Sequence, residues 1–131
     1  MRPIVDLYKS DGTKQTPTAN VFTLAGATTY YAELTEFVEG RSMFSLHYLY
    51  NAALVAAITL EASNRPRDEA NAYAAVGSGW ATTSATTVSP AASAGETVAH
   101  YADYLAARTR IKIVVTTGGT LRIDEHSKGA F

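Results

Sequence analysis

The fold is decided by residues 41–64, which read RSMFSLHYLYNAALVAAITLEASN. In each half of this stretch, apolar side chains alternate with mostly polar ones. Because successive side chains of a strand point to opposite faces, this period of two predicts two β-strands, each with one buried face. We expect the two strands to form the central pair of the fold, with the rest of the chain supplying their partners. The predicted buried faces carry Phe44, Leu46, Tyr48 and Tyr50 in the first strand and Ile58, Leu60 and Ala62 in the second.

The clearest hairpin prediction lies near the C-terminus. Apolar residues alternate from Ile111 to Val115 and again from Leu121 to Ile123, with the glycine turn Thr116–Gly119 between them. A short glycine turn between two alternating segments is typical of an antiparallel hairpin. The opposite face of these strands, which we place away from the core, carries Arg110, Lys112, Val114, Arg122 and Asp124.

Shorter segments complete an all-β pattern, and the turn residues Asp11 and Gly12 follow the first of them. Six to eight short strands without βα alternation predict a mainly β protein, an antiparallel β-sandwich that is jelly-roll-like. At most one short helix is expected, at about Asp68–Ala75. Residues 1–20 are predicted to form an N-terminal edge strand and an extended arm, and residues 21–131 a single β-sandwich domain. The additional predicted strands are Ile4–Tyr8, Val21–Leu24, Thr28–Val38 and Ala81–Val88.

Composition excludes several classes of function. A length of 131 residues suits one domain. A net charge of −1, with no run of more than two basic residues, does not favour nucleic acid as a ligand. The absence of cysteine excludes disulfides and cysteine-ligated metals. We also expect no signal peptide and no membrane span, because no apolar run is long enough, and hence synthesis in the cytoplasm.

No candidate for catalysis or metal binding stands out. His47 lies on the face opposite the predicted core, where a polar residue at a solvent or interface position is the simpler interpretation. The sequence Asp124-Glu125-His126 resembles a metal cluster, yet adjacent strand residues point to opposite faces, so at most Asp124 and His126 could chelate together. We therefore predict no metal and no cofactor.

Carboxylates could in principle pair for glycoside hydrolysis, but we expect them to be solvated surface charges. No nucleophile elbow, Walker A loop or dinucleotide fingerprint is present. The sequence thus predicts a protein that is not an enzyme and has no catalytic residues. The carboxylates considered are Glu61, Asp68, Glu69, Glu96 and Asp103.

The linear pattern of residues 41–129 resembles small β-sandwich structural proteins of tailed bacteriophages. The resemblance begins with the strand Ser42–Tyr48, a second strand ending at Thr59–Asn64, and a loop leading to Trp80. It continues with the strand Tyr104–Ile113, which a Gly-Gly hairpin joins to a closing strand that contains Thr120–Ile123. Residues 1–40 lie outside the resemblance, and Arg65–Gly79 is longer than expected.

The resemblance implies a capsid decoration, or cement, protein on the outer surface of the virion. Its partners would be the major capsid protein and copies of itself, with a trimer or another closed oligomer expected. Interface function would lie in residues 1–20, 65–79 and 90–95, whose deletion is expected to abolish assembly and leave the fold. The interface candidates are Tyr8, Lys14, Pro17, Tyr30, Tyr31, Arg65, Arg67, Tyr73, Trp80 and Tyr101.

The alternative is a carbohydrate-binding or host-adhesion module of a phage head or tail. Trp80 could stack on a sugar together with Tyr73 or Tyr101, because aromatic rings of this kind serve sugar sites as well as cores and subunit interfaces.

Overall fold

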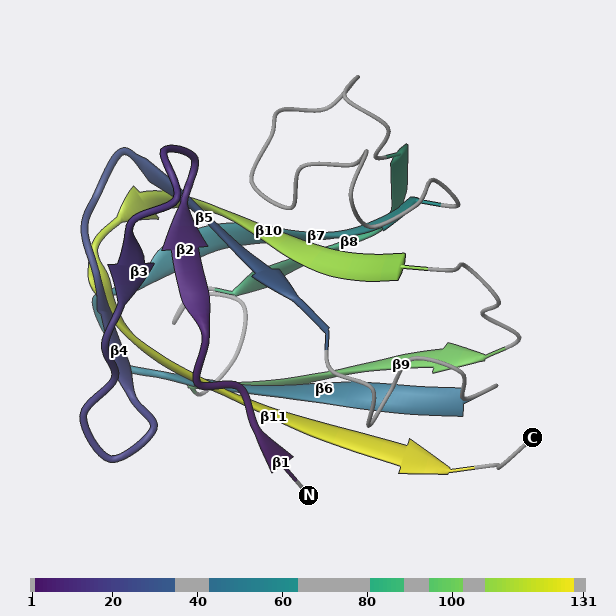
Figure 1. Ribbon diagram of the computed structural model, residues 1–131. Helices are drawn as coiled ribbons and strands as arrows, with labels where there is room; N and C mark the ends of the chain where they lie inside the picture. Colours follow the sequence, from purple (N-terminus) through teal and green to yellow (C-terminus); the bar gives the residue numbers. More distant parts are fainter. Residues whose placement is uncertain (1, 35–42, 64–80, 89–94, 103–107, 129–131) are drawn as a thin grey trace.

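The chain forms a two-layered all-β structure (Figure 1). The computed structural model describes residues 2–34, 43–63, 81–88, 95–102 and 108–128. Within these ranges no helix is long and apolar enough to cross a membrane. The strands are β1 Arg2–Pro3, β2 Leu7–Lys9, β3 Lys14–Gln15, β4 Phe22–Leu24, β5 Thr28–Glu33, β6 Met43–Tyr50, β7 Val55–Ser63, β8 Ala81–Val88, β9 Glu96–Ala102, β10 Arg108–Thr117 and β11 Gly119–Lys128.

The strands form two antiparallel sheets with a jelly-roll arrangement. The six-stranded sheet has the order β3-β2-β5-β10-β7-β8, and the five-stranded sheet has the order β1-β11-β6-β9, with β4 also paired to β11. Each of the consecutive pairs β4/β5, β6/β7, β8/β9 and β10/β11 is divided between the two sheets. The chain therefore crosses repeatedly from one layer to the other, as in a double-sheet jelly roll. The predicted antiparallel, jelly-roll-like β-sandwich is confirmed.

Two predicted strand pairings are wrong. Strands β6 and β7, predicted as a central pair, lie in opposite sheets, and so do β10 and β11, predicted as a hairpin. Instead, β6 pairs with β11, and β7 pairs with β10. An alternating pattern says which face of a strand is buried, but both sheets bury their inner faces in the same core. The pattern alone therefore cannot distinguish two strands that pair from two strands that face each other.

The connection from β6 to β7 is hydrogen-bonded to the start of β11. Asn51 N donates to Thr120 O at 3.3 Å, and Thr120 N donates to Asn51 Oδ1 at 3.2 Å. Gly118 of the predicted glycine turn approaches the end of β4, where a Cβ on it would stand 2.7 Å from Leu24 O. Glycine is required here by the close approach of neighbouring backbone and not by a hairpin.

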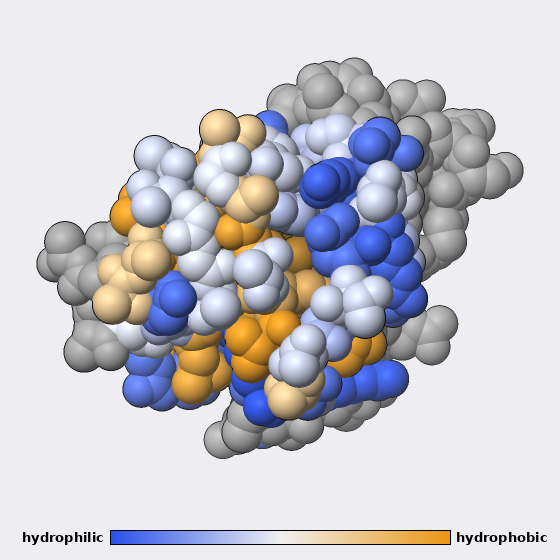
Figure 2. Space-filling view, turned by 90° about the vertical axis from the view of Figure 1, so that its left-hand side faces the viewer, coloured by the Kyte–Doolittle hydropathy of each residue, from blue (hydrophilic) through white to orange (hydrophobic). Residues whose placement is uncertain are grey.

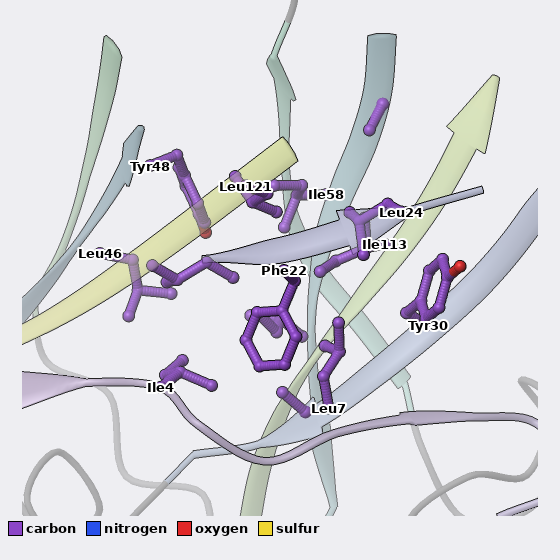
Figure 3. Close-up of a cluster of buried hydrophobic side chains, with 14 of the residues drawn as sticks. Ile4, Leu7, Phe22, Leu24, Tyr30, Leu46, Tyr48, Ile58, Ile113 and Leu121 are labelled. Atoms are coloured by element: carbon purple, nitrogen blue, oxygen red, sulfur yellow. The ribbon is translucent and has the colours of Figure 1, made fainter. Parts of the chain in front are cut away.

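The core fills the space between the two inner faces (Figure 3). The apolar side chains that the alternation predicts to be buried are buried in β6, β7, β10 and β11 with few exceptions, although some predicted outward positions, Glu61, Ser63, Arg110 and Asp124, are buried as well. One exception is Ala62, which is half-buried and lies just beyond an irregularity between Leu60 and Glu61 in the pairing of β7 with β8. The fully or nearly fully buried set includes Phe44, Leu46, Tyr48, Tyr50, Ile58, Leu60, Ile111, Ile113, Val115, Leu121 and Ile123.

Residues 2–20 contain three short strands, β1 to β3, which lie at one edge of each sheet. Strand β1 pairs with β11, and β2 pairs with both β3 and β5. Ile4 and Leu7 are 3% and 0% exposed and lie in the core cluster. The predicted turn is present, with Gly12 at a φ of 88°. Because these residues bury apolar surface, their deletion should impair the fold itself, contrary to the expectation from sequence.

The other predicted segments have mixed outcomes. The strands predicted at Val21–Leu24 and Ala81–Val88 are observed as β4 and β8. The strand predicted at Thr28–Val38 is observed as β5, which ends at Glu33. The predicted helix at Asp68–Ala75 lies outside the described residues.

Candidate functional site

All three histidines of the chain lie on one surface, the outer face of the five-stranded sheet. Central strand β6 carries Ser45, which lies opposite His126 of β11 and His100 of β9. The next outward residue of β6 is His47, flanked in the same way by Asp124 and Val98. We call this surface the histidine face; it comprises Ser45, His47, Leu49, Glu96, Val98, His100, Arg122, Asp124 and His126.

A carboxylate lies against the central histidine. His47 Nε2 is 2.6 Å from Glu96 Oε1, and the two side chains are 29% and 59% exposed. The two atoms are close, but their geometry is not that of a hydrogen bond.

A second ion pair lies on the same face. Arg122 Nε donates to both carboxylate oxygens of Asp124 at 3.1–3.2 Å, and Arg122 Nη2 donates to Asp124 Oδ1 at 3.2 Å. The Asp124 side chain is only 5% exposed, whereas that of Arg122 is 37% exposed. The guanidinium of Arg122 therefore neutralises the nearly buried carboxylate of Asp124, while part of the Arg122 side chain remains exposed to solvent.

The Asp124-Glu125-His126 motif is divided between the two faces of β11. Glu125 is 0% exposed and lies on the side of the core residue Ile123, while Asp124 and His126 lie on the histidine face. Asp124 is already engaged by Arg122. Within the described ranges, no three or more His, Cys, Asp and Glu side chains are grouped so as to hold a metal ion.

A buried ion pair lies on the outer face of the six-stranded sheet. Its two residues were predicted from the sequence to be exposed. Arg110 Nε and Nη2 both lie 2.7 Å from Glu61 Oε1, and both side chains are 0% exposed. The guanidinium also lies 4.5 Å from the centre of the Tyr31 ring, a cation–π distance. Glu61 and Arg110 are thus interior residues and not solvated charges. Three more of the carboxylates considered from the sequence lie outside the described residues, namely Asp68, Glu69 and Asp103.

The interface candidates do not gather in one place. Tyr30 and Tyr31 are 1% and 3% exposed, so their side chains are packed within the single chain. Lys14 is exposed, with its Nζ 2.8 Å from Asp6 Oδ1, and Tyr8 and Pro17 are half-buried. Tyr101 lies in β9 opposite Phe44, and its side chain is not described. Four candidates lie outside the described residues, namely Arg65, Arg67, Tyr73 and Trp80.

A shallow polar hollow of about 330 Å³ lies between the turn after β2 and the start of β5. It is lined by Lys9, Ser10, Asp11, Ala27, Thr28 and Thr29. Figure 2 views the end of the sandwich where β2, β3 and β4 lie; hydrophilic residues gather on one side, and hydrophobic residues are visible at the centre. The hollow has no aromatic wall on which a sugar ring could stack.

In this hollow, the carboxylate of Asp11 accepts a hydrogen bond from Thr13 N at 2.9 Å. Hydrogen bonds from Thr13 hold the pKa of Asp11 below its usual value of 3.8. The contact therefore stabilises the fold above the unfolded pKa, and this contribution is lost as the pH falls through the folded pKa. We expect the Asp11 carboxyl to titrate below pH 3.8 in an NMR experiment; a midpoint above that value would contradict the contact.

Sequence reasoning placed His47 correctly but did not recognise the face around it. One local signal was available, because Glu96, Val98 and His100 alternate along β9 and share a face. The approach of His126 to this group depends on β11 pairing with β6, which no local pattern reveals.

Comparisons with known proteins establish the fold and leave the function open. No protein-family model matches the chain, and no curated protein matches it either. Among solved structures, the chain is similar to PirA, with a TM-score of 0.50 and 14% identity over 81% of this chain and 91% of that one. It is also similar to the Yersinia pseudotuberculosis-derived mitogen, with a TM-score of 0.49 and 13% identity over 82% of each chain. At this identity, the likeness to PirA supports the β-sandwich alone.

Proposed function

We propose that the chain is a non-enzymatic structural protein of a bacteriophage virion, specifically a decoration protein that binds the outer capsid surface and bridges neighbouring subunits. The observation that carries the proposal is the histidine face. Its contact groups are distributed over three adjacent strands and include the exposed Val98 and His100. A broad sheet surface of this kind suits docking on another protein, whereas small ligands favour concave sites.

The mixed chemistry of the face fits a protein partner. It combines an exposed apolar side chain, Val98, with the partly exposed arginine Arg122 and three imidazoles. Arginine and apolar groups are typical contact residues, and imidazoles can donate or accept hydrogen bonds. The resemblance to phage proteins also supports the proposal, except in one respect: the strands on either side of the Gly-Gly turn lie in different sheets and are not paired.

The proposed mechanism is stabilisation by mass action. A protein that binds only the assembled shell stabilises it by about 2.7 kcal/mol per site when its free concentration is 100 times the Kd. Repeated copies on a symmetric lattice add their contributions, and bridging of neighbours converts weak contacts into avidity. The major capsid protein and further copies of the chain are the proposed partners.

Cosedimentation with mature shells, assembled from the major capsid protein of the same genome, tests the function and the face together. We expect saturable binding by the native chain and about tenfold weaker binding by His126→Glu, a loss typical of a central contact. The matched control is Val114→Glu, because Val114 is 40% exposed on the outer face of the other sheet. We expect it to bind as the native chain does.

Failure of the native chain to bind shells would contradict the decoration role. Equal weakening by the two substitutions would show that the histidine face is not the docking surface. Selective binding to a glycan array, without binding to shells, would favour the carbohydrate-binding alternative.

A further inference from the structure

The strand β9 forms one edge of the five-stranded sheet. It pairs with β6 along one side, and no other strand in the described part of the chain pairs with it. An edge strand presents a row of backbone N–H and C=O groups to any second strand that can approach. The edge of β9 therefore offers a template for pairing.

The hydrogen-bond pattern identifies the backbone groups that face this edge. Tyr50 N donates to Gly95 O at 2.9 Å, and the register of β6 on β9 continues without a shift along the whole strand. In an antiparallel ladder, residue pairs that exchange hydrogen bonds alternate with pairs that do not. Thr97 therefore directs its N–H and C=O toward β6, whereas those of Val98 and His100 point away from it.

The side chains of β9 are complementary to a second copy of the same strand. When two copies run antiparallel with Val98 at the centre, Val98 lies opposite its counterpart, and Glu96 of each copy lies opposite His100 of the other. Directly opposite residues share a face and have Cβ atoms about 4.5–5.5 Å apart. Two valines, each 46% exposed in the single chain, would then meet between two carboxylate–imidazole pairs.

We propose that β9 pairs with β9 of a second copy of the chain about a two-fold axis at Val98. The backbone groups of Val98 in the two copies bond to each other, and the two five-stranded sheets become one continuous sheet. Such an interface is isologous, since each copy contributes the same patch. The two histidine faces then lie side by side on one surface.

This dimer does not depend on the proposed function, because it follows from the hydrogen-bond pattern and charges of one edge. The proposed pairing makes a dimer of the chain the basic unit of assembly, in place of the trimer expected from the sequence. A single strand pair is a small interface, so the dimer should dissociate on dilution. If shells are not bound but the dimer forms, the functional proposal fails and this one stands.

Light scattering coupled to size exclusion tests the pairing with two substitutions in β9. We expect the native chain to approach twice its 14.0 kDa mass as concentration rises. Val98→Pro removes an N–H that faces the open edge and leaves the ladder to β6 intact, a position where proline is tolerated. We expect this variant to stay at the mass of one chain with an unchanged circular dichroism spectrum.

Charge reversal gives a second test that does not touch the backbone. His100→Glu sets a carboxylate opposite Glu96 of the other copy and should halve the observed mass, whereas His100→Lys sets an ammonium group opposite Glu96 and should remain dimeric. The amide of Val98 should also become protected from hydrogen exchange as concentration rises. A native chain that stays at 14.0 kDa at every concentration, or a dimer that survives both Val98→Pro and His100→Glu, would overturn the proposal.

Discussion

Replacement of Arg110 with methionine is expected to lower the free energy of unfolding by about 3–5 kcal/mol, the range for removal of one partner of a buried ion pair. The substitution leaves the Glu61 carboxylate at 0% exposure without the guanidinium that neutralises it. No donor among the described residues reaches Glu61 Oε2, so within that part of the chain the compensation comes from the contacts of Oε1 with Arg110. The stacking of Arg110 on Tyr31 is lost as well.

The double variant Arg110→Met/Glu61→Met is the matched control. Because well-packed apolar residues can replace a buried ion pair at little cost, we expect it to be clearly more stable than Arg110→Met alone. Urea unfolding of the native chain, both single variants and the double variant completes a double-mutant cycle. A loss below about 1 kcal/mol in Arg110→Met would mean that the pair is exposed to water and worth no more than a surface ion pair.

Replacement of Gly119 with alanine is expected to lower the free energy of unfolding by about 1–3 kcal/mol or more, the cost of forcing atoms into a packed site. A Cβ at this position would contact Asn51 Oδ1 and would stand 2.8 Å from Leu54 N and 2.9 Å from Leu54 Cα. Because two of these three atoms belong to the backbone, relief requires that the β6–β7 connection and the start of β11 move apart.

The control for this prediction is Gly12→Ala, in the turn between β2 and β3. Nothing lies within 4 Å of a Cβ at Gly12, although its φ of 88° makes any side chain strained. The cost there is that of a left-handed conformation, about 1–2 kcal/mol. Thermal and urea unfolding compare the two variants. If Gly119→Ala were as stable as the native chain, the close contact between the β6–β7 connection and the start of β11 would be disproved.

The sequence predicts the buried faces of this protein well because the period of two is a local property. Phe44 to Tyr50 and Ile111 to Val115 bury the side chains that their alternation indicates. Strand pairing is not local. The inner faces of β6 and β7 look toward one core from opposite sheets, and a glycine turn signals close backbone approach as readily as a hairpin.

Because strand pairing is not local, the buried ion pair and the histidine face could not be predicted from the sequence. Arg110 follows the alternation of β10 and so reads as an outward residue, and only the register opposite Glu61 reveals its buried partner. The histidine face likewise draws one histidine from each of three strands that pair only in the folded chain. Local pattern can place each residue on a face, but neighbours across strands follow from topology.

Scanning calorimetry of mature shells tests the decoration role most directly. A protein that binds the assembled lattice and bridges its subunits must raise the temperature at which the shells come apart, and the rise must grow with its concentration. We predict this rise for the native chain and a smaller one for His126→Glu at the same concentration. Shells that come apart at the same temperature with and without saturating native chain would contradict the account.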